Sequence, residues 1–372
     1  MIASRFLALF PALALGFAVS AADARPSVVF DLGTGQVLAQ EDALQAWHPA
    51  SLTKLMTAYV TFRALQAGEL TVKSPVKMTK NAAKRPPAKM GYKPGAVMTL
   101  DNALKMLLVK SANDIAVAVA ENVAGSEANF VARMNAEAVR LGMTGSHFAN
   151  PNGLDDPANV TTARDMAVLA MAIRREFPEH AHYFSIEALT DGKRILKTYN
   201  LLIGRFDGAD GMKTGYICAS GFNMVGSATR DGRTVIAVVL GEKDGLKRTE
   251  KAAELLAKGF MADPRSGTPL AALSGASPSM APDLRETQCP KPVKPPPGAK
   301  PAKPAGSEAV EKPKLNSPWL HELQRELVAV KVGLGGAVGQ PVAIEEPAKP
   351  VPVPTPRPEP AVKAADNRGA AQ

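Results

Sequence analysis

The chain has 372 residues, a formal net charge of +9, five histidines and two cysteines. The histidines lack the spacing of metal ligands and no phosphate-binding loop is present, so we expect neither a metal nor a cofactor. The basic stretches have no interleaved aromatic residues, which argues against nucleic-acid binding. Two cysteines do not make a disulfide framework, and the sequence leaves open whether Cys218 and Cys289 pair.

The N-terminus has the features of a secretory signal. Arg5 precedes an uncharged apolar run over residues 6–19, and Ala22-Asp23-Ala24 fits a small-residue cleavage site, with Val19-Ser20-Ala21 as an alternative. The run is short for a membrane span. We therefore expect residues 1–24 to be removed during secretion and the mature protein to work outside the cytoplasm.

Composition divides the mature chain into two parts. Residues 25–263 hold most of the aromatic residues and the periodic apolar segments, and this length can bury the core of one large domain. Residues 264–372 are rich in Pro, Ala and Lys, so we expect a disordered, low-complexity tail. Within it, Ser317 and Pro318 have the pattern of a helix start. Residues 317–330 are therefore a candidate short helix for a weak membrane or partner contact.

The first part is expected to begin with a hairpin, in which strands 27–31 and 36–40 flank a Gly-Thr-Gly turn. A helix then begins near Ser51, because apolar residues follow at three-to-four spacing. Residues 73–95 are basic and broken by prolines, so we expect mostly loop. Further helical patterns cover residues 100–109, 114–123, 127–141 and 162–174, with a turn at 150–153.

After Asp191 the pattern changes to short β-rich segments separated by glycine: residues 194–199, 221–228 and 234–240. Residues 247–260 then have the pattern of a closing helix. This order of elements predicts an α+β fold, with an antiparallel sheet flanked by helices and a helical lobe.

Ser51 and Lys54 form the first candidate site. A serine at a helix N-terminus has unpaired backbone N–H groups and the positive end of the helix dipole beside it. Lys54 lies on the same face, where its amine can take the hydroxyl proton if burial or a second cation lowers its pKa. Ser74 and Lys77 have the same spacing, but a proline follows that serine, and we interpret the segment as strand or loop.

A second cluster, Lys110-Ser111-Ala112-Asn113-Asp114, lies between two predicted helices. The hydroxyl of Ser111 can relay a proton, and the amide of Asn113 can bind a substrate amide. Both residue types are also common helix caps, which is the structural alternative.

A third cluster enters a later strand. The Lys213 cation and the Thr214 hydroxyl suit a carboxylate. Gly215 leaves room for a substrate along the strand edge, and the backbone N–H of Tyr216 can join that of Ser51 in holding an oxyanion. The alternative is a charged residue and a hairpin glycine on a surface strand.

The order Ser-x-x-Lys, Ser-x-Asn, Lys-Thr-Gly resembles the penicillin-recognising serine enzymes, and within them the D-alanyl-D-alanine carboxypeptidases, the low-molecular-mass penicillin-binding proteins. Segments 48–57, 150–155, 162–167 and 210–215 are similar to that family as well, so the resemblance covers roughly residues 25–262. It implies a β-lactamase/transpeptidase-like fold and a protein that works in the periplasm. It also implies an enzyme that removes the terminal D-Ala from peptidoglycan stem pentapeptides and reacts covalently with β-lactam antibiotics.

The resemblance implies a role for each candidate residue. Ser51 is the acylated nucleophile, Lys54 its base, and Ser111 the proton relay toward the leaving amine, while the N–H groups of residues 51 and 216 hold the oxyanion. Four residues are implied in substrate binding, the last three through the terminal carboxylate: Asn113, Lys213, Thr214 and Arg248.

Three features depart from the family pattern. The tail cannot supply the small β-rich domain that often follows the catalytic one, and no amphipathic anchor is recognisable at the C-terminus, so membrane association stays open. Ile217 stands where a small hydroxyl residue is expected, which bears on strand-edge contacts.

Three other functions compete with the carboxypeptidase. A DD-endopeptidase of the same family would use the same residues. An inactive peptidoglycan-binding module would not need a nucleophile and a base together. A class A β-lactamase would need Asp at position 112, where Ala112 stands, and a deacylating Glu that we do not find.

Overall fold

The computed structural model describes residues 25–275, 280–290, 315 and 317–344. The predicted signal, residues 1–24, lies outside the described residues. One six-stranded sheet organises the fold, in the order β10-β2-β1-β9-β8-β7, and every neighbouring pair is antiparallel. Its strands are β1 (Ser27–Asp31), β2 (Gln36–Glu41), β7 (Ala209–Ile217), β8 (Gly221–Arg230), β9 (Arg233–Glu242) and β10 (Thr268–Pro269).

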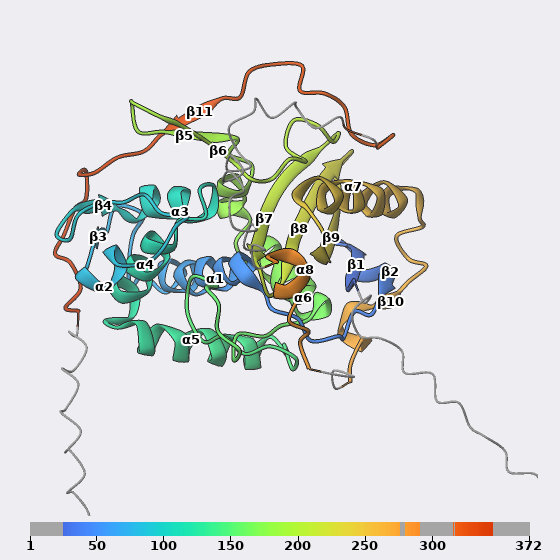
Figure 1. Cartoon of the computed structure of the whole chain (residues 1–372), viewed down its shortest axis with the longest axis horizontal. Helices are drawn as coiled ribbons and strands as arrows, with labels where there is room; N and C mark the ends of the chain where they lie inside the picture. The colour runs from blue at the N-terminus through green and yellow to red at the C-terminus, as the bar shows by residue number, and fades with distance from the viewer. Residues whose placement is uncertain (1–24, 276–279, 291–314, 316, 345–372) are drawn as a thin grey trace, which may run out of the picture.

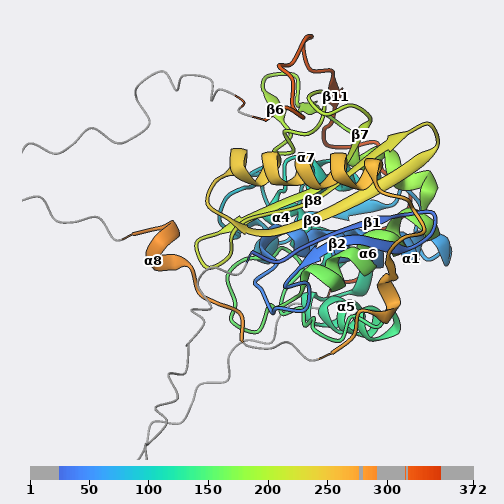
Figure 2. The same ribbon diagram turned by 90° about the vertical axis from the view of Figure 1, so that its right-hand side faces the viewer.

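Helices cover both faces of this sheet. The closing helix α7 (Gly245–Met261) lies on one face, and α6 (Ala163–Glu176) and α1 (Thr53–Gln66) lie on the other, as Figure 2 shows. Alternation along β9 explains the two layers, because successive side chains of a strand point to opposite faces. Val235 and Ala237 belong to the apolar cluster beneath α7, whereas Ile236 and Val238 belong to the larger cluster that contains α1 and α6.

The helical lobe is built around α1. Four helices and two short strands form the rest of it: α2 (Lys80–Ala83), α3 (Leu100–Leu108), α4 (Asn113–Ala124), α5 (Glu127–Arg140), β3 (Pro75–Lys77) and β4 (Val97–Thr99). Every residue of α1 from Thr53 to Phe62 is buried. The spacing predicts only one buried apolar face, whereas the helix is covered on all sides. The Ser74–Lys77 segment is the strand or loop that its proline predicts.

Local sequence signals account for where the helices begin and end. The side chains of Thr79, Thr99, Ser126 and Thr162 accept a hydrogen bond from a backbone N–H in the first turn of α2, α3, α5 and α6. Gly125 ends α4 in the left-handed conformation that glycine adopts at low cost.

The remaining elements lie beside the sheet and the lobe. Three are single-turn or short 3₁₀ helices, η2 (Ala50–Leu52), η3 (Pro178–Phe184) and η4 (Leu270–Ala272), and α8 (Arg285–Gln288) is one α-helical turn. A second, small sheet has the order β11-β5-β6 and contains β5 (Ala188–Thr190), β6 (Ile195–Lys197) and β11 (Ala329–Lys331). No helix among the described residues has both the length and the apolar character to cross a membrane.

The described parts of the chain after residue 263 show more order than the composition predicts. Described parts of it lie against the domain (Figure 1), and Leu270, Leu320 and Val332 are buried there. The prediction of a helix over residues 317–330 is wrong, because this segment is irregular and leads into β11, which pairs in parallel with β5. Backbone pairing across more than a hundred residues offers these N–H groups partners that no local pattern reveals.

The two cysteines form a disulfide. Cys218 follows β7, Cys289 follows α8, and the bond joins positions 71 residues apart. The pairing that the sequence leaves open is thus present in the structure.

Candidate active site

Ser51 and Lys54 lie at the start of α1. Ser51 is in the 3₁₀ turn η2, which leads directly into the helix, and Lys54 follows on the same face in the first α-helical turn. Lys54 Nζ lies 3.0 Å from Ser51 Oγ, and the lysine side chain is completely buried whereas the serine is partly exposed. The serine therefore faces solvent from a position that its candidate base reaches from inside.

The hydrogen-bond partners of Lys54 are all neutral groups. Its amine donates to Asn113 Oδ1 over 2.8 Å and to the carbonyl oxygen of Asn152, and among the described residues no carboxylate forms an ion pair with it. Burial is the main cause that lowers the pKa of Lys54 well below its usual value, and the nearby Lys213 cation lowers it further against the opposing effect of Asp114.

The three contacts of Lys54 can be made by an ammonium group or by a neutral amine, and the lowered pKa favours the neutral amine. A neutral amine has two N–H donors and one lone pair, whereas an ammonium group has three donors and no lone pair. Asn113 and Asn152 offer only acceptor oxygens to this amine, so in the neutral form they take its two hydrogens. The lone pair is then left for the hydroxyl hydrogen of Ser51, which is the arrangement that a general base requires.

Ser111 contacts the second buried lysine, Lys213. Ser111 lies between α3 and α4, and Lys213, in the middle of β7, places its Nζ 3.0 Å from Ser111 Oγ. Lys213 also donates to the carbonyl of Thr214 over 2.7 Å. Burial, and after it the Arg248 cation, lowers the pKa of Lys213 to about 7. Near neutral pH this group therefore interconverts easily between its charged and neutral forms.

Asn113 is the first residue of α4, and both ends of its amide have protein partners. Its oxygen accepts from Lys54, and its Nδ2 donates to the carbonyl of Pro86 over 3.1 Å. The substrate contact expected from the sequence stays a prediction. The geometry adds a second task, the positioning of the lysine amine.

Arg248 lies in the first turn of α7 and is almost completely buried. Its guanidinium donates to the carbonyl of Tyr199 over 3.1 Å and lies 5.9 Å from the centre of the Phe222 ring, while its Nε has no hydrogen-bond partner. Burial lowers its pKa to about 10. A buried cation with an unsatisfied donor and no acidic partner among the described residues suits a carboxylate ligand.

The backbone around these residues is tightly constrained. Ala50, Ser111 and Met212 have positive φ angles of 48°, 58° and 94°, and each is a site residue or its direct neighbour. Such conformations are rare outside glycine and persist where surrounding contacts impose them. A Cβ added at Gly215 would lie 3.0 Å from Ser51 N, so β7 passes directly beside the nucleophile.

A cleft of about 520 Å³ opens at this point, between the exposed edge of β7 and the helical lobe. All six predicted site residues other than the two buried lysines line it: Ser51, Ser111, Asn113, Thr214, Tyr216 and Arg248. Lys54 and Lys213 reach the same site from behind. The structure thus brings every predicted site residue together, although their catalytic roles stay predictions.

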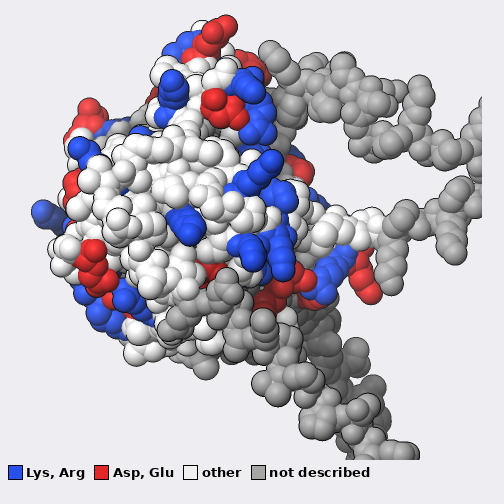
Figure 3. Space-filling model, turned by 90° about the vertical axis from the view of Figure 1, so that its left-hand side faces the viewer, with Lys and Arg blue, Asp and Glu red and all other residues white. Residues whose placement is uncertain are grey.

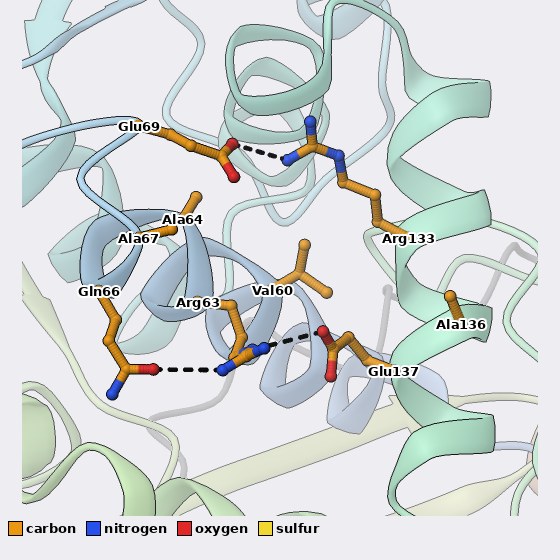
Figure 4. Close-up of a pocket in the computed structure, with 9 residues that line it drawn as sticks. All are labelled: Val60, Arg63, Ala64, Gln66, Ala67, Glu69, Arg133, Ala136 and Glu137. Carbon is orange, nitrogen blue, oxygen red and sulfur yellow. Dashed lines mark hydrogen bonds and ion pairs between the residues drawn. The ribbon is translucent and has the colours of Figure 1, made fainter.

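Lys89 and Lys110 are sequence neighbours of the cleft-lining residues Ala88 and Ser111, and Figure 3 shows Lys and Arg gathered in patches on the side of the helical lobe. A smaller hollow between α1 and α5 contains the ion pairs Arg63–Glu137 and Arg133–Glu69 (Figure 4). It has no nucleophile, so we interpret it as a structural feature.

Two site residues escape the sequence patterns. The carbonyl of Asn152 holds Lys54, but the Asn-Pro-Asn-Gly segment indicates only a turn, and nothing in a turn signal shows what its carbonyl groups face. Tyr199, which binds Arg248 through its carbonyl and Lys110 through its hydroxyl, has no local signal at all.

Comparison with known proteins agrees with the geometry. The family model of D-alanyl-D-alanine carboxypeptidases matches residues 16–244. The chain is 37% identical over 251 residues to D-alanyl-D-alanine carboxypeptidase DacC of Escherichia coli K12, a match that covers 64% of this chain and 61% of that protein. It is 38% identical over 243 residues to DacD of Salmonella typhimurium LT2, covering 63% and 62%. The chain thus spans about three fifths of these curated relatives.

Solved structures give the same result. DacD from Francisella tularensis is similar with a TM-score of 0.62 and 30% identity, covering 69% of this chain and 74% of that one. Penicillin-binding protein D2 from Listeria monocytogenes, whose structures include an ampicillin-bound form, has a TM-score of 0.58 and 29% identity, covering 64% and 97%. The expected β-lactamase/transpeptidase-like fold is confirmed, and the chain belongs to the D-alanyl-D-alanine carboxypeptidase family.

Proposed function

We propose that the protein is a serine D-Ala-D-Ala carboxypeptidase, which removes the terminal D-Ala from peptidoglycan stem pentapeptides through an acyl-enzyme at Ser51. The observation that carries this proposal is the contact set of Lys54: two carbonyl acceptors, one hydroxyl and no acidic partner among the described residues. A module that only binds peptidoglycan does not need an amine kept neutral beside a serine.

Acylation begins at the nucleophile. Lys54 takes the hydroxyl proton of Ser51 over their 3.0 Å contact as Oγ attacks the carbonyl carbon of the penultimate D-Ala. The N–H groups of Ser51 and Tyr216 stabilise the oxyanion, and the loss of one such donor typically costs about a hundred- to a thousandfold in rate. Lys213, Thr214 and Arg248 hold the terminal carboxylate, which supplies the negative charge that their site lacks.

Collapse of the tetrahedral intermediate breaks the amide bond. Ser111 passes its proton to the leaving amine of the terminal D-Ala and regains the proton that Lys54 took from Ser51, so that Lys54 is neutral again; Lys213 contacts the Ser111 hydroxyl during this step. Lys54 then removes a proton from an incoming water, which hydrolyses the ester and restores Ser51.

β-Lactam antibiotics are the expected covalent inhibitors, since a ring amide with a nearby carboxylate offers the same two groups as the peptide terminus. The ampicillin- and cefotaxime-bound forms of the Listeria protein support this expectation. The signal-like residues 1–24 support action in the periplasm. Membrane or partner contact through residues 317–330 loses its helical rationale, because that segment lies along the domain.

Two substrates test the proposal. Purified protein is incubated with a stem pentapeptide and, separately, with a cross-linked stem-peptide dimer, and products are separated by liquid chromatography. Release of D-Ala from the pentapeptide supports the carboxypeptidase, whereas cleavage of the dimer alone would show the DD-endopeptidase instead. Intact-protein mass spectrometry after penicillin treatment should find one adduct, absent in Ser51→Ala; no adduct on the unmodified protein would indicate an inactive binding module.

A further inference from the structure

The disulfide fastens a late segment of the chain beside the cleft. Cys218 is the residue after β7, and its partner Cys289 directly follows α8. Two further contacts hold the same segment. The N–H of Leu284 donates to the carbonyl of Ala219 over 3.0 Å, and Arg285 binds Asp155 over 2.5 Å. The segment 283–289 is therefore held at both the strand and the loop that border the active site.

The fastened segment borders a second hollow. This chamber of about 790 Å³ is lined by Asp155, by residues 216–219 at and after the end of β7, by Arg285 and Glu286 of α8, and by Cys289 after it. Pro87, Tyr216 and Ile217 line both this chamber and the catalytic cleft. The two hollows are therefore neighbours along β7, and Figure 1 shows α8 in front of the sheet at this strand.

The direction of β7 assigns the chamber to one end of a substrate. β7 is an edge strand of the six-stranded sheet, so an extended peptide can add to it. Along β7 the carboxylate-binding Thr214 comes first, then the Tyr216 N–H that faces the scissile carbonyl, then Ile217 and Cys218. A peptide whose terminal carboxylate lies at Thr214 must therefore extend its preceding residues toward Cys218 and the chamber.

We propose that the chamber is the subsite for the residues that precede the scissile bond, with the disulfide-held segment 283–289 as its outer wall. This inference rests on the proposed function and adds the position and construction of the acyl-side subsite. The ligand is an extended peptide whose side chain at the wall is cationic or neutral. Arg285 is already compensated by Asp155 and Asp283, and Glu286 has no ion pair within the described part of the chain.

Peptide length separates this role from general support of the fold. We would compare N-acetyl-D-Ala-D-Ala, which ends before the chamber, with acetylated tetrapeptides that end in D-Ala-D-Ala and carry Lys or Glu immediately before them. In Cys218→Ser/Cys289→Ser, kcat/KM for the lysine tetrapeptide should fall by about tenfold relative to the dipeptide, because only the longer substrate uses the wall. The unmodified protein should prefer the lysine over the glutamate tetrapeptide by about threefold.

A matched pair of arginine variants controls for surface effects. Arg285→Ala removes the ion pair with Asp155 and should weaken tetrapeptide turnover selectively. Arg133→Ala removes an ion pair of similar exposure in the hollow of Figure 4 and should change neither substrate. Penicillin acylation and the Tm of each variant report whether the active site is folded.

Each outcome decides between the two proposals. An equal loss of kcat/KM on dipeptide and tetrapeptide, or no loss on either, would overturn the proposed subsite. A preference for the glutamate tetrapeptide would overturn the proposed preference of the wall for a cationic side chain. Absence of turnover and of penicillin acylation in the unmodified protein would instead refute the proposed function itself.

Discussion

Gly153 lies closer to the nucleophile's backbone than any side chain allows. A Cβ added there would lie 1.9 Å from the carbonyl oxygen of Ala50 and 3.0 Å from Ser51 N, whereas real Cβ contacts stay above 3.0 Å. In Gly153→Ala either the loop 150–155 or the turn at Ala50 must therefore move by about 1 Å. Either movement changes the site, because Ser51 follows Ala50 and Asn152 holds Lys54.

The expected cost is in rate more than in folding. A displacement of about 1 Å at a catalytic group typically costs about a hundredfold, so acylation by a fluorescent penicillin, followed in a stopped-flow instrument, should slow by about that factor. The positive φ of +75° at this position adds roughly 1–2 kcal/mol of backbone strain in the alanine variant.

Gly142→Ala separates strain from displacement. Gly142 has a similar φ of +69°, but no atom lies within 4 Å of its added Cβ. Both variants should lose comparable stability through strain, and only Gly153→Ala should acylate slowly. Wild-type acylation by a folded Gly153→Ala protein would refute the reasoning that this loop fixes the position of Ser51 and Lys54.

Three further predictions concern charge. The pKa of Lys213 is about 7 in the folded protein and has its ordinary value of 10.5 in the unfolded chain, so between these two pH values the unfolded chain binds the extra proton. The urea-derived free energy of unfolding should therefore rise from pH 7 to pH 10 relative to Lys213→Met; an unchanged difference would contradict a depressed pKa. Because the Lys213 cation is lost above about pH 7, KM for the pentapeptide should rise there, while a substrate amidated at its terminus should show no such rise. Arg248→Gln should raise KM for the free-acid peptide by at least about tenfold and leave that of the amide little changed, and equal effects on both would argue against a carboxylate contact.

The main elements of the domain follow from patterns within short windows of sequence. Helices α3 to α7 and strands β1, β2, β8 and β9 lie where spacing, caps and glycines indicate them, because each pattern reflects one face packed against the core. The three motif clusters could be identified from residue types and their order. That they meet depends on β7 passing beside η2, a contact between segments about 160 residues apart that the family resemblance implies but no local pattern contains.

Long-range contacts explain what the sequence patterns miss. The segment 317–330 has apolar residues at helical spacing, yet pairing with β5 and an ion pair between Arg325 and Glu187 hold it extended. The pairing of Cys218 with Cys289 depends on where the chain after residue 263 returns to the domain, which its Pro-rich composition does not indicate. The second task of Asn113 is equally invisible, because it depends on a lysine 59 residues away.

The titration of the Lys54 amine tests the central claim most directly. Protein labelled with ¹³C and ¹⁵N at lysine is followed by NMR from pH 6 to pH 11, and Lys54→Met assigns the signal. We expect Lys54 to titrate well below 10.5 and its pKa to rise in Lys213→Met, since that cation lowers it. A Lys54 that stays protonated up to about its ordinary pKa of 10.5 would contradict the account of a neutral base beside Ser51.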